Sequence, residues 1–273
     1  MSGSLRAKWN ILKAELQNHR RMLIAFSGGC DSAFLMTAAR LVLGKENVLA
    51  VTAVSASLPI KERDATVCVA AQLDVTHEFL ETRELEDPNY TANPSNRCFF
   101  CKNELFNRLA SLAQEKNMLL ADGFNASDRS DYRPGFQAAQ KWQVIHPLND
   151  ANLFKKDIRA LSRWLRVPTW NKPASPCLSS RIPYGTPVSK NSLWQIEQAE
   201  EALHQEGFAV VRVRHYGRLA RVEVPLKDLN ALQETPCWTR IIAKLHTLGY
   251  EQVEIDPRGF KSGRLNENSI ATF

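Results

Sequence analysis

The segment Ala25-Phe26-Ser27-Gly28-Gly29-Cys30-Asp31-Ser32 has the composition of a loop that binds phosphate. Glycines let the backbone turn tightly and expose its N–H groups, and the N-terminus of a following helix adds positive partial charge. The segment lacks the closing Gly-Lys-Ser/Thr of a Walker A loop and the Gly-x-Gly-x-x-Gly of dinucleotide folds. Asp31 offers carboxylate oxygens, which Mg²⁺ prefers as ligands. The pattern predicts a nucleotide phosphate site; the alternative is a glycine turn capped by Asp31 or Ser32.

A second polar segment begins with Asp122-Gly123-Phe124-Asn125. Gly123 would let the backbone approach a nucleotide. Asp128, Asp131 and Arg133 follow it and offer contacts to Mg²⁺ and phosphate. Taken alone, the segment equally describes a polar loop of capping residues. Its occurrence beside the first segment favours nucleotide binding.

Three of the six cysteines form the third candidate site. Cys98-Phe99-Phe100-Cys101 is a lone Cys-x-x-Cys, which suits a redox pair, half of a zinc site or part of an iron–sulfur site. Cys177, in a proline-rich loop, is the natural third thiolate, and three thiolates on a cubane leave one iron open to carry a sulfide. The alternative is that Cys98 and Cys101 pack at a helix start while Cys177 acts alone. The others are expected to be core thiols: Cys30, Cys68 and Cys237.

Paired arginines near the C-terminus are the fourth candidate. Arg212 and Arg214 alternate along a predicted strand and therefore share one face. Two guanidinium groups suit a phosphate, with Glu223 on the neighbouring strand and Glu200 on the preceding helix. The alternative is a solvated sheet face with surface ion pairs.

Alternating strand and helix signals in the first half of the chain position the first two sites. The predicted strands are Met22–Phe26, Val48–Val54, His77–Leu80 and Met118–Ala121, and the predicted helices are Asp31–Leu43, Ile60–Leu73 and Asn103–Lys116. This order predicts an α/β fold with a doubly wound parallel sheet. Ligands of such sheets bind beyond the carboxyl ends of the strands. Both Ser27–Gly29 and Asp122–Asn125 fall at that edge.

The pattern changes after a proline-rich stretch, Pro168 to Pro187. A smaller α+β domain is expected beyond it, with helices at Ser192–Glu206 and Thr239–Leu248 and strands at Val210–Val213, Ala220–Val224 and Gln252–Ile255. We therefore predict a first domain over residues 1–170, a cysteine-bearing loop over 171–188 and a second domain over 189–273.

Composition places the chain among globular proteins. Its 273 residues are 44% hydrophobic and 23% charged, which excludes disorder, collagen and a coiled coil as the main state. A net charge of +6 suits an anionic small molecule, a nucleotide or RNA. The most apolar stretch, Val48–Leu58, is far shorter than the ~18 residues of a membrane span, and no signal-peptide pattern opens the chain. The expected location is the cytoplasm.

The first segment, Ser-Gly-Gly-x-Asp-Ser, resembles the pyrophosphate loop of the adenine nucleotide α-hydrolase (PP-loop) superfamily, whose Rossmann-like enzymes split ATP between the α and β phosphates. Over nearly the whole chain the sequence resembles the LarE family of ATP-dependent pyridinium-3,5-biscarboxylic acid mononucleotide sulfurtransferases, which serve biosynthesis of the nickel-pincer nucleotide of lactate racemase. The resemblance runs through Asp131-Tyr132-Arg133-Pro134-Gly135, Asn171-Lys172, Ser179-Ser180-Arg181-x-Pro183-Tyr184-Gly185, Val211-Arg212-Val213-Arg214 and Gly259-Phe260-x-Ser262-Gly263-Arg264. The strings that begin at Asp131 and Ser179 are far more specific than the first segment, which is found across the superfamily.

The resemblance implies a role for each candidate residue. It implies Cys177, Asp31 and Arg181 as catalytic residues. It implies nucleotide binding by Ala25, Phe26, Ser27, Gly28, Gly29, Asp31, Ser32, Gly123, Asn125 and Arg133. It implies that Glu200, Arg212, Arg214 and Glu223 lie near the phosphate and carboxylate of a nucleotide-like substrate. The implied cofactors are ATP and Mg²⁺, and the implied assembly is a homo-oligomer.

The resemblance also implies one of two sulfur chemistries. In one, a single cysteine gives up its own sulfur and becomes dehydroalanine; that cysteine stands where this chain has Pro176. In the other, which Cys98, Cys101 and Cys177 match, three cysteines hold a [4Fe–4S] cluster that delivers a sulfide, whose external source is unknown. The rival functions are a tRNA thiolase of the same superfamily and a non-catalytic nucleotide-binding regulator. The absence of an RNA-binding module and the modest charge disfavour tRNA.

Overall fold

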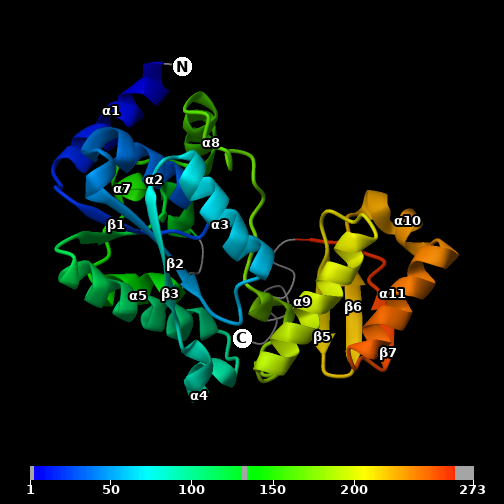
Figure 1. Cartoon of the computed structure of the whole chain (residues 1–273). Helices are drawn as coiled ribbons and strands as arrows, with labels where there is room; N and C mark the ends of the chain where they lie inside the picture. Colours follow the sequence, from blue (N-terminus) through cyan, green and yellow to red (C-terminus); the bar gives the residue numbers. More distant parts are fainter. Residues whose placement is uncertain (1–2, 131–133, 262–273) are drawn as a thin grey trace. The chain divides into compact units, whose positions relative to one another are not determined.

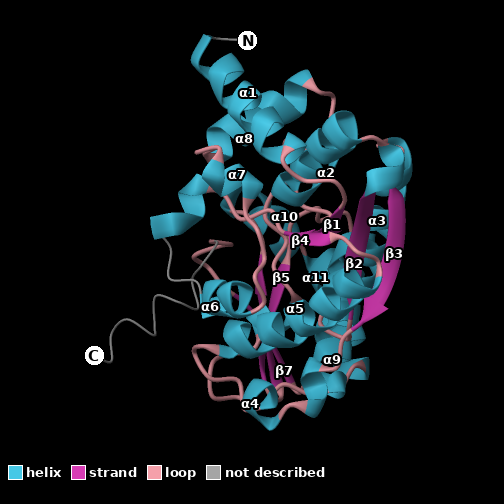
Figure 2. Ribbon diagram, turned by 90° about the vertical axis from the view of Figure 1, so that its left-hand side faces the viewer, coloured by secondary structure: helices cyan, strands magenta, loops and turns pink. Residues whose placement is uncertain are grey.

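Four short apolar segments form a parallel sheet in the computed structural model, which describes residues 3–130 and 134–261. The strands are β1 (Met22–Ala25), β2 (Val48–Val54), β3 (Thr76–Glu81) and β4 (Leu119–Ala121), in the order β3-β2-β1-β4. All three strand pairings are parallel. Figure 2 shows β2 and β3 side by side. The predicted α/β fold with a parallel sheet is confirmed.

Helices cover both faces of this sheet because successive side chains of a strand point to opposite faces. Met22 and Ile24 of β1 pack into a core with α1, α2 and α8, whereas Leu23 packs with Phe106 of α5 and Ala138 of α6. Figure 1 shows α2 and α5 on opposite sides of the strands. The helices of this part are α1 (Gly3–Gln17), α2 (Cys30–Leu43), α3 (Ile60–Gln72), α5 (Arg97–Glu115), α6 (Pro134–Lys141), α7 (Pro147–Asp150) and α8 (Lys155–Trp164), with 3-10 helices η1 (Lys45–Asn47), η2 (Glu84–Glu86) and η3 (Ala126–Ser130).

The chain divides into two compact units. Unit 1 comprises Met1–Glu84 and Cys98–Ser175, and unit 2 comprises Leu85–Arg97 and Pro176–Phe273. Unit 2 therefore takes in a short segment that the sequence places with the first domain. Within unit 2, the amide nitrogen of Asn93 donates to the carbonyls of Pro183 and Thr186, both at 2.8 Å, and the Arg97 guanidinium donates to the Ser179 carbonyl at 3.1 Å. These buried contacts attach the segment to unit 2.

Unit 2 has the α+β character expected of the second domain. Its strands are β5 (Arg212–Tyr216), β6 (Leu219–Glu223) and β7 (Gln252–Ile255), and its helices are α4 (Pro88–Thr91), α9 (Lys190–Gln205), α10 (Leu229–Gln233), α11 (Thr235–Thr247) and the 3-10 helices η4 (Leu178–Arg181) and η5 (Leu226–Asp228). β5 and β6 are antiparallel, and β6 and β7 are parallel. Val213, Val222 and Leu245 are fully buried in the core between the sheet and its helices.

Some elements differ from the sequence-based expectation. Strand β5 begins at Arg212, two residues later than expected, and α5 begins at Arg97, so that the Cys-x-x-Cys lies at the N-terminal end of this helix. Helix α8 was not expected. Among the described residues, no helix is both long enough and apolar enough to span a membrane.

Gly123 is the residue at which the loop after β4 meets the start of α2. A Cβ atom built on Gly123 would lie 2.9 Å from the backbone nitrogen of Ser32 and 3.1 Å from the carbonyl carbon of Asp31. These are backbone atoms of a helix, which cannot turn aside as a flexible side chain can. Only glycine therefore allows this approach.

We predict that Gly123→Ala lowers the free energy of unfolding by about 1–3 kcal/mol, the usual cost of overpacking. Urea unfolding followed by circular dichroism measures it. Gly3→Ala is the matched control, because a Cβ at Gly3 meets nothing within 4 Å. Equal unfolding midpoints for Gly123→Ala and the wild type would contradict the prediction.

Candidate functional site

The loop between β1 and α2 presents a helix N-terminus at the carboxyl edge of the sheet. Gly28 has φ +71°, a conformation that favours glycine, and Gly29 is the N-cap residue of α2. Glycine has no side chain with which to cap the helix. The Ser32 hydroxyl accepts from the Ser27 backbone N–H at 3.3 Å and lies 3.1 Å from the Ser27 hydroxyl. The loop is thus held from within, and its geometry suits an anion.

Asp31 holds a cation at this site. Both of its carboxylate oxygens accept from the Lys155 ammonium, Oδ1 at 2.7 Å and Oδ2 at 2.6 Å. Both side chains are partly open to solvent. The carboxylate thus binds one positive charge beside the loop, and its hard oxygens fit Mg²⁺ at the same place.

A second lysine contacts the loop itself. The Lys172 ammonium donates to the Gly28 carbonyl at 3.1 Å and to Glu62 at 2.7 Å. Neither Lys155 nor Lys172 was singled out from the sequence as a site residue. The sequence analysis included Lys172 only as part of the string Asn171-Lys172. The signal that could have pointed to Lys155 is its position at the start of an amphipathic helix.

The loop after β4 has features of both structures expected from the sequence, a close approach to the phosphate-binding loop and a polar loop of capping residues. It reaches the site at Gly123, yet its polar residues mainly hold one another. The buried Asn125 side chain accepts from the Ser127 N–H at 2.9 Å, and the Asp128 carboxylate accepts from the Asn125 N–H at 3.1 Å. Asn125 therefore shapes the loop that approaches the start of α2 at Gly123. Asp131 and Arg133 lie outside the described residues.

The cysteines divide between the two units. Cys98 and Cys101 lie at the N-terminal end of α5 in unit 1, Cys98 exposed and Cys101 partly so, while the partly exposed Cys177 lies in unit 2. Their convergence stays a prediction. The expectation of a core thiol holds for Cys30, where burial raises the pKa of the thiol, and is wrong for Cys68, which is exposed on α3.

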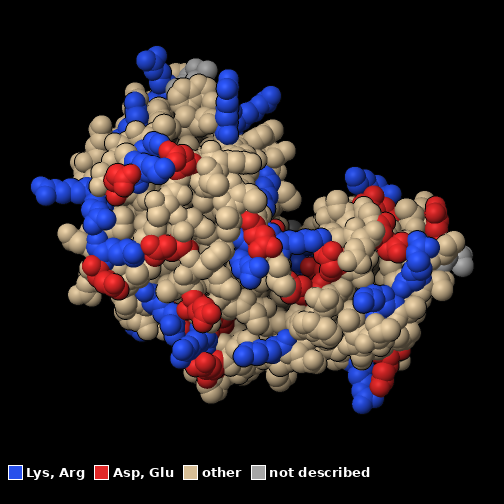
Figure 3. All heavy atoms as spheres, in the orientation of Figure 1, with Lys and Arg blue, Asp and Glu red and all other residues tan. Residues whose placement is uncertain are grey.

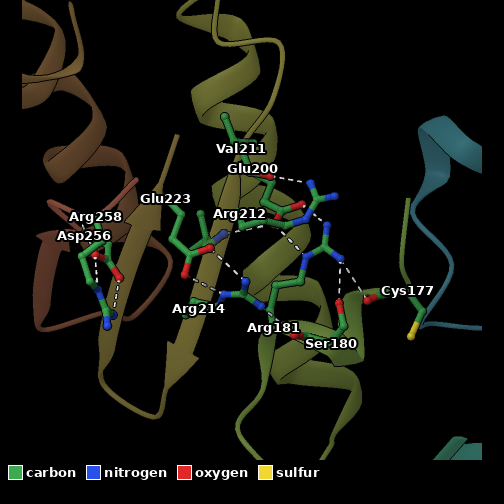
Figure 4. A network of polar contacts seen from close by, with 11 residues as sticks. Cys177, Ser180, Arg181, Glu200, Val211, Arg212, Arg214, Glu223, Asp256 and Arg258 are labelled. Carbon is green, nitrogen blue, oxygen red and sulfur yellow. Dashed lines mark hydrogen bonds and ion pairs between the residues drawn. The ribbon is translucent and has the colours of Figure 1, made fainter. Parts of the chain in front are cut away.

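A buried network of charges occupies one face of unit 2 (Figure 4). Arg181, only 2% exposed, binds the Glu200 carboxylate through two hydrogen bonds of 2.8 and 2.9 Å. Its remaining terminal nitrogen donates to the carbonyls of Pro176, at 2.7 Å, and Cys177, at 3.0 Å. Arg181 thereby fixes the backbone that bears the thiol, whose sulfur lies on the far side of that backbone from the arginines in Figure 4. The geometry makes Arg181 a positioning residue.

Arg214 repeats this arrangement on β5. It binds the Glu223 carboxylate through two hydrogen bonds of 3.0 and 2.9 Å and donates to the Ser180 carbonyl at 2.9 Å. Glu200 also accepts from the Val213 N–H at 3.0 Å. Each carboxylate thus neutralises one guanidinium and ties the η4 segment, directly or through its partner, to β5.

The two glutamates of this network pair with Arg181 and Arg214, and neither forms an ion pair with Arg212. Arg212 lies opposite Glu223 in the strand register, yet Glu223 binds Arg214. Among the described residues, Arg212 contacts the Val211 carbonyl at 2.6 Å and the Phe260 ring, and forms no ion pair. Burial, with the nearby charges of Arg181 and Arg214, lowers the pKa of Arg212 to about 10, so it stays protonated at neutral pH. A desolvated guanidinium of this kind suits an anion.

Comparison with known proteins now adds to this geometry. No protein-family model matches the chain. An uncharacterized protein of Synechocystis sp. is 39% identical over 94% of this chain and 98% of its own length. An uncharacterized protein of Methanocaldococcus jannaschii is 26% identical over 93% of this chain and 95% of its own length.

A relative of stated function covers the whole chain as well. Pyridinium-3,5-bisthiocarboxylic acid mononucleotide synthase of Lactiplantibacillus plantarum is 34% identical over 99% of both chains. Identity at this level over the full length, together with the loop and the arginine network, confirms the resemblance found in the sequence: the chain belongs to the LarE family, that of pyridinium-3,5-bisthiocarboxylic acid mononucleotide synthase.

Proposed function

We propose that this protein is an ATP-dependent sulfurtransferase that converts a carboxylate of pyridinium-3,5-biscarboxylic acid mononucleotide into a thiocarboxylate, in biosynthesis of the nickel-pincer nucleotide. The full-length identity to the Lactiplantibacillus plantarum synthase carries the proposal. Two features of the chain support it. Unit 1 presents a helix N-terminus with Asp31 beside it, and unit 2 presents the arginine network beside Cys177.

The first step is adenylation at the loop of unit 1. A substrate carboxylate oxygen attacks the α phosphorus of ATP, and the bond to the bridging oxygen of the β phosphate breaks, so that pyrophosphate leaves. Such transfers depend mostly on positioning and charge neutralisation. The first-turn N–H groups of α2 suit the departing pyrophosphate, and Asp31 would hold the Mg²⁺ that neutralises it.

The substrate anion has its counterpart in unit 2. Arg212 is protonated, largely desolvated and without an ion pair among the described residues, so a phosphate or carboxylate of the substrate would neutralise it. Arg214 and Glu223 hold each other in place beside it. Figure 3 shows basic and acidic side chains interspersed over the visible surface, which favours a small anion over tRNA.

The second step moves sulfur to the activated carbonyl. A sulfur nucleophile at Cys177 attacks the acyl carbon, the bond to the AMP oxygen breaks, and a thiocarboxylate remains. The residues that would hold a [4Fe–4S] cluster are Cys98, Cys101 and Cys177; such a cluster, when bound, supplies the sulfide at its open iron. Cys98 and Cys101 fit this role because they lie one turn apart at a helix N-terminus, which favours negative charge.

A contact within unit 2 supports the meeting of these thiols. Arg97 donates to the Ser179 carbonyl at 3.1 Å. Arg97 directly precedes Cys98, and Ser179 follows Cys177 by two residues. The side chain of the residue that precedes Cys98 is therefore bonded to the backbone that follows Cys177.

We predict that Asp31→Asn abolishes ATP-dependent release of pyrophosphate, because the amide cannot hold Mg²⁺ against the phosphates. A coupled pyrophosphate assay with the biscarboxylate substrate measures it. The fold should persist, since the Asp31 carboxylate is partly exposed. Near-normal release by the folded variant would overturn the role of Asp31, and no release by the wild type would overturn the proposed function.

Arg212→Met gives a second prediction, with opposite effects on stability and binding. Because the folded pKa of Arg212 lies below its ordinary value, its charge costs stability at any pH below both values. Removing the charge should raise the free energy of unfolding by about 1–2 kcal/mol and weaken substrate binding at least tenfold. Urea unfolding and calorimetry measure the two effects.

The matched control is Arg221→Met. Arg221 lies on β6, next to β5, but is only partly buried and pairs with Glu254. This change should leave both stability and substrate affinity close to the wild type. Unchanged substrate affinity in Arg212→Met would show that Arg212 does not bind the substrate anion.

The cysteines separate the two sulfur chemistries. We predict that Cys98→Ala, Cys101→Ala and Cys177→Ala each remove both iron and sulfur transfer from anaerobically purified protein, whereas Cys68→Ala removes neither. Iron assay, absorption spectra and product analysis measure this. If only Cys177→Ala is inactive, the sacrificial route holds instead, and mass spectrometry should then show Cys177 lighter by about 34 Da after one turnover, the mass of H₂S.

A further inference from the structure

Asp31, which is expected to bind Mg²⁺, forms an ion pair with Lys155. Asp31 follows the loop at the start of α2, and Lys155 is the first residue of α8, 124 positions later in the chain. The ammonium bridges both carboxylate oxygens, at 2.7 and 2.6 Å. The Lys155 side chain is 38% exposed and that of Asp31 is 26% exposed. The pair is therefore open to solvent and to small ions.

The backbone of Lys155 is fixed while the tip of its side chain is not. Its N–H donates to the Ser127 hydroxyl at 2.9 Å, and in the preceding residue the Phe154 N–H donates to Asp157 at 3.1 Å. Asp157 in turn binds Lys8. The contacts of the ammonium that the structure describes are those to Asp31 alone. Lys155 can therefore change partner without any movement of α8.

Asp31 cannot serve Lys155 and Mg²⁺ with the same oxygens. A divalent ion that arrives with a polyphosphate competes for the carboxylate, and it carries twice the charge of the ammonium. The displaced ammonium then lies beside phosphate oxygens, for which a lysine is a well-suited point charge. Exchange of partners keeps every charge neutralised before and after binding.

We propose that Lys155 binds the polyphosphate of the nucleotide, and that Asp31 binds the Lys155 ammonium until the nucleotide arrives. Without nucleotide, Lys155 neutralises Asp31. When Mg²⁺ and ATP bind, Asp31 turns to Mg²⁺ and the Lys155 ammonium binds an oxygen of the pyrophosphate group. This proposal rests on the proposed function for the identity of the nucleotide, and it adds the residue that exchanges.

The exchange has a signature that a merely structural ion pair lacks. Lys155→Met frees Asp31 from its competing cation, so binding of a divalent metal alone should tighten about three- to fivefold, the scale of a partly exposed ion pair. The same change removes a charge-assisted hydrogen bond to phosphate, so binding of pyrophosphate at saturating Mg²⁺ should weaken about tenfold or more. The two affinities move in opposite directions.

The experiment titrates purified full-length protein with Mn²⁺ alone, followed by electron paramagnetic resonance of the free ion, and with inorganic pyrophosphate at saturating Mg²⁺, followed by calorimetry. Lys156→Met is the matched control, because it removes the same charge from the neighbouring exposed position. It should change both affinities less than twofold. Lys155→Arg keeps a competing cation and should bind Mn²⁺ as the wild type does.

Two outcomes would overturn the proposal, and a third would overturn only the proposed function. Unchanged or weaker Mn²⁺ binding in Lys155→Met would show that the ion pair does not compete with metal. Unchanged pyrophosphate binding would show that the ammonium does not reach phosphate. A wild type that binds Mn²⁺ and pyrophosphate but releases no pyrophosphate from ATP with the biscarboxylate would overturn the proposed function while leaving the exchange intact.

Discussion

The close approach of Gly123 to the first turn of α2 is the constraint on which the site in unit 1 depends. Parallel pairing of β1 with β2 and β4 brings the loops after these strands to one edge of the sheet. Parallel pairing alone leaves those loops free to splay apart. The absence of a side chain at Gly123 lets its loop touch the backbone of Ser32, and η3 follows this loop directly. Ser127 of η3 then accepts from the Lys155 N–H and so places Lys155 opposite Asp31.

Electrostatics distinguish the two units. In unit 1 each of the two lysines at the loop, Lys155 and Lys172, holds a carboxylate, so the site is neutral before a ligand arrives. In unit 2 three arginines share two glutamates, and Arg212 remains as a desolvated charge with a lowered pKa. A partly buried charge without an ion pair lowers stability. A substrate anion that pairs with Arg212 would offset this cost in unit 2. In unit 1, a neutral site suits a ligand that brings its own metal ion.

The sequence predicted the fold and the edge of the sheet because those follow from local patterns. The buried run Val48–Val54 became a strand with the predicted bounds, and the glycine loop lies where a parallel sheet requires it. The sequence did not predict which carboxylate forms an ion pair with which arginine or lysine. That Glu223 binds Arg214 and not Arg212, which lies opposite it, depends on side-chain geometry across two strands. The pairing of Asp31 with Lys155 joins residues far apart in the chain, and no local pattern encodes that contact.

The chain itself limits how far sulfur can lie from the nucleotide loop. Lys172 is bonded to the Gly28 carbonyl in unit 1, and Cys177 follows it by five residues. Five extended residues span at most about 18 Å, so the Cα atom of Cys177 stays within that distance of the Cα atom of Lys172. Arg181 holds the Cys177 carbonyl to the arginine and glutamate network of unit 2. The backbone at Cys177 is thus bonded to the arginines expected to hold the substrate, and it follows by five residues a lysine bonded to the loop expected to activate a carboxylate.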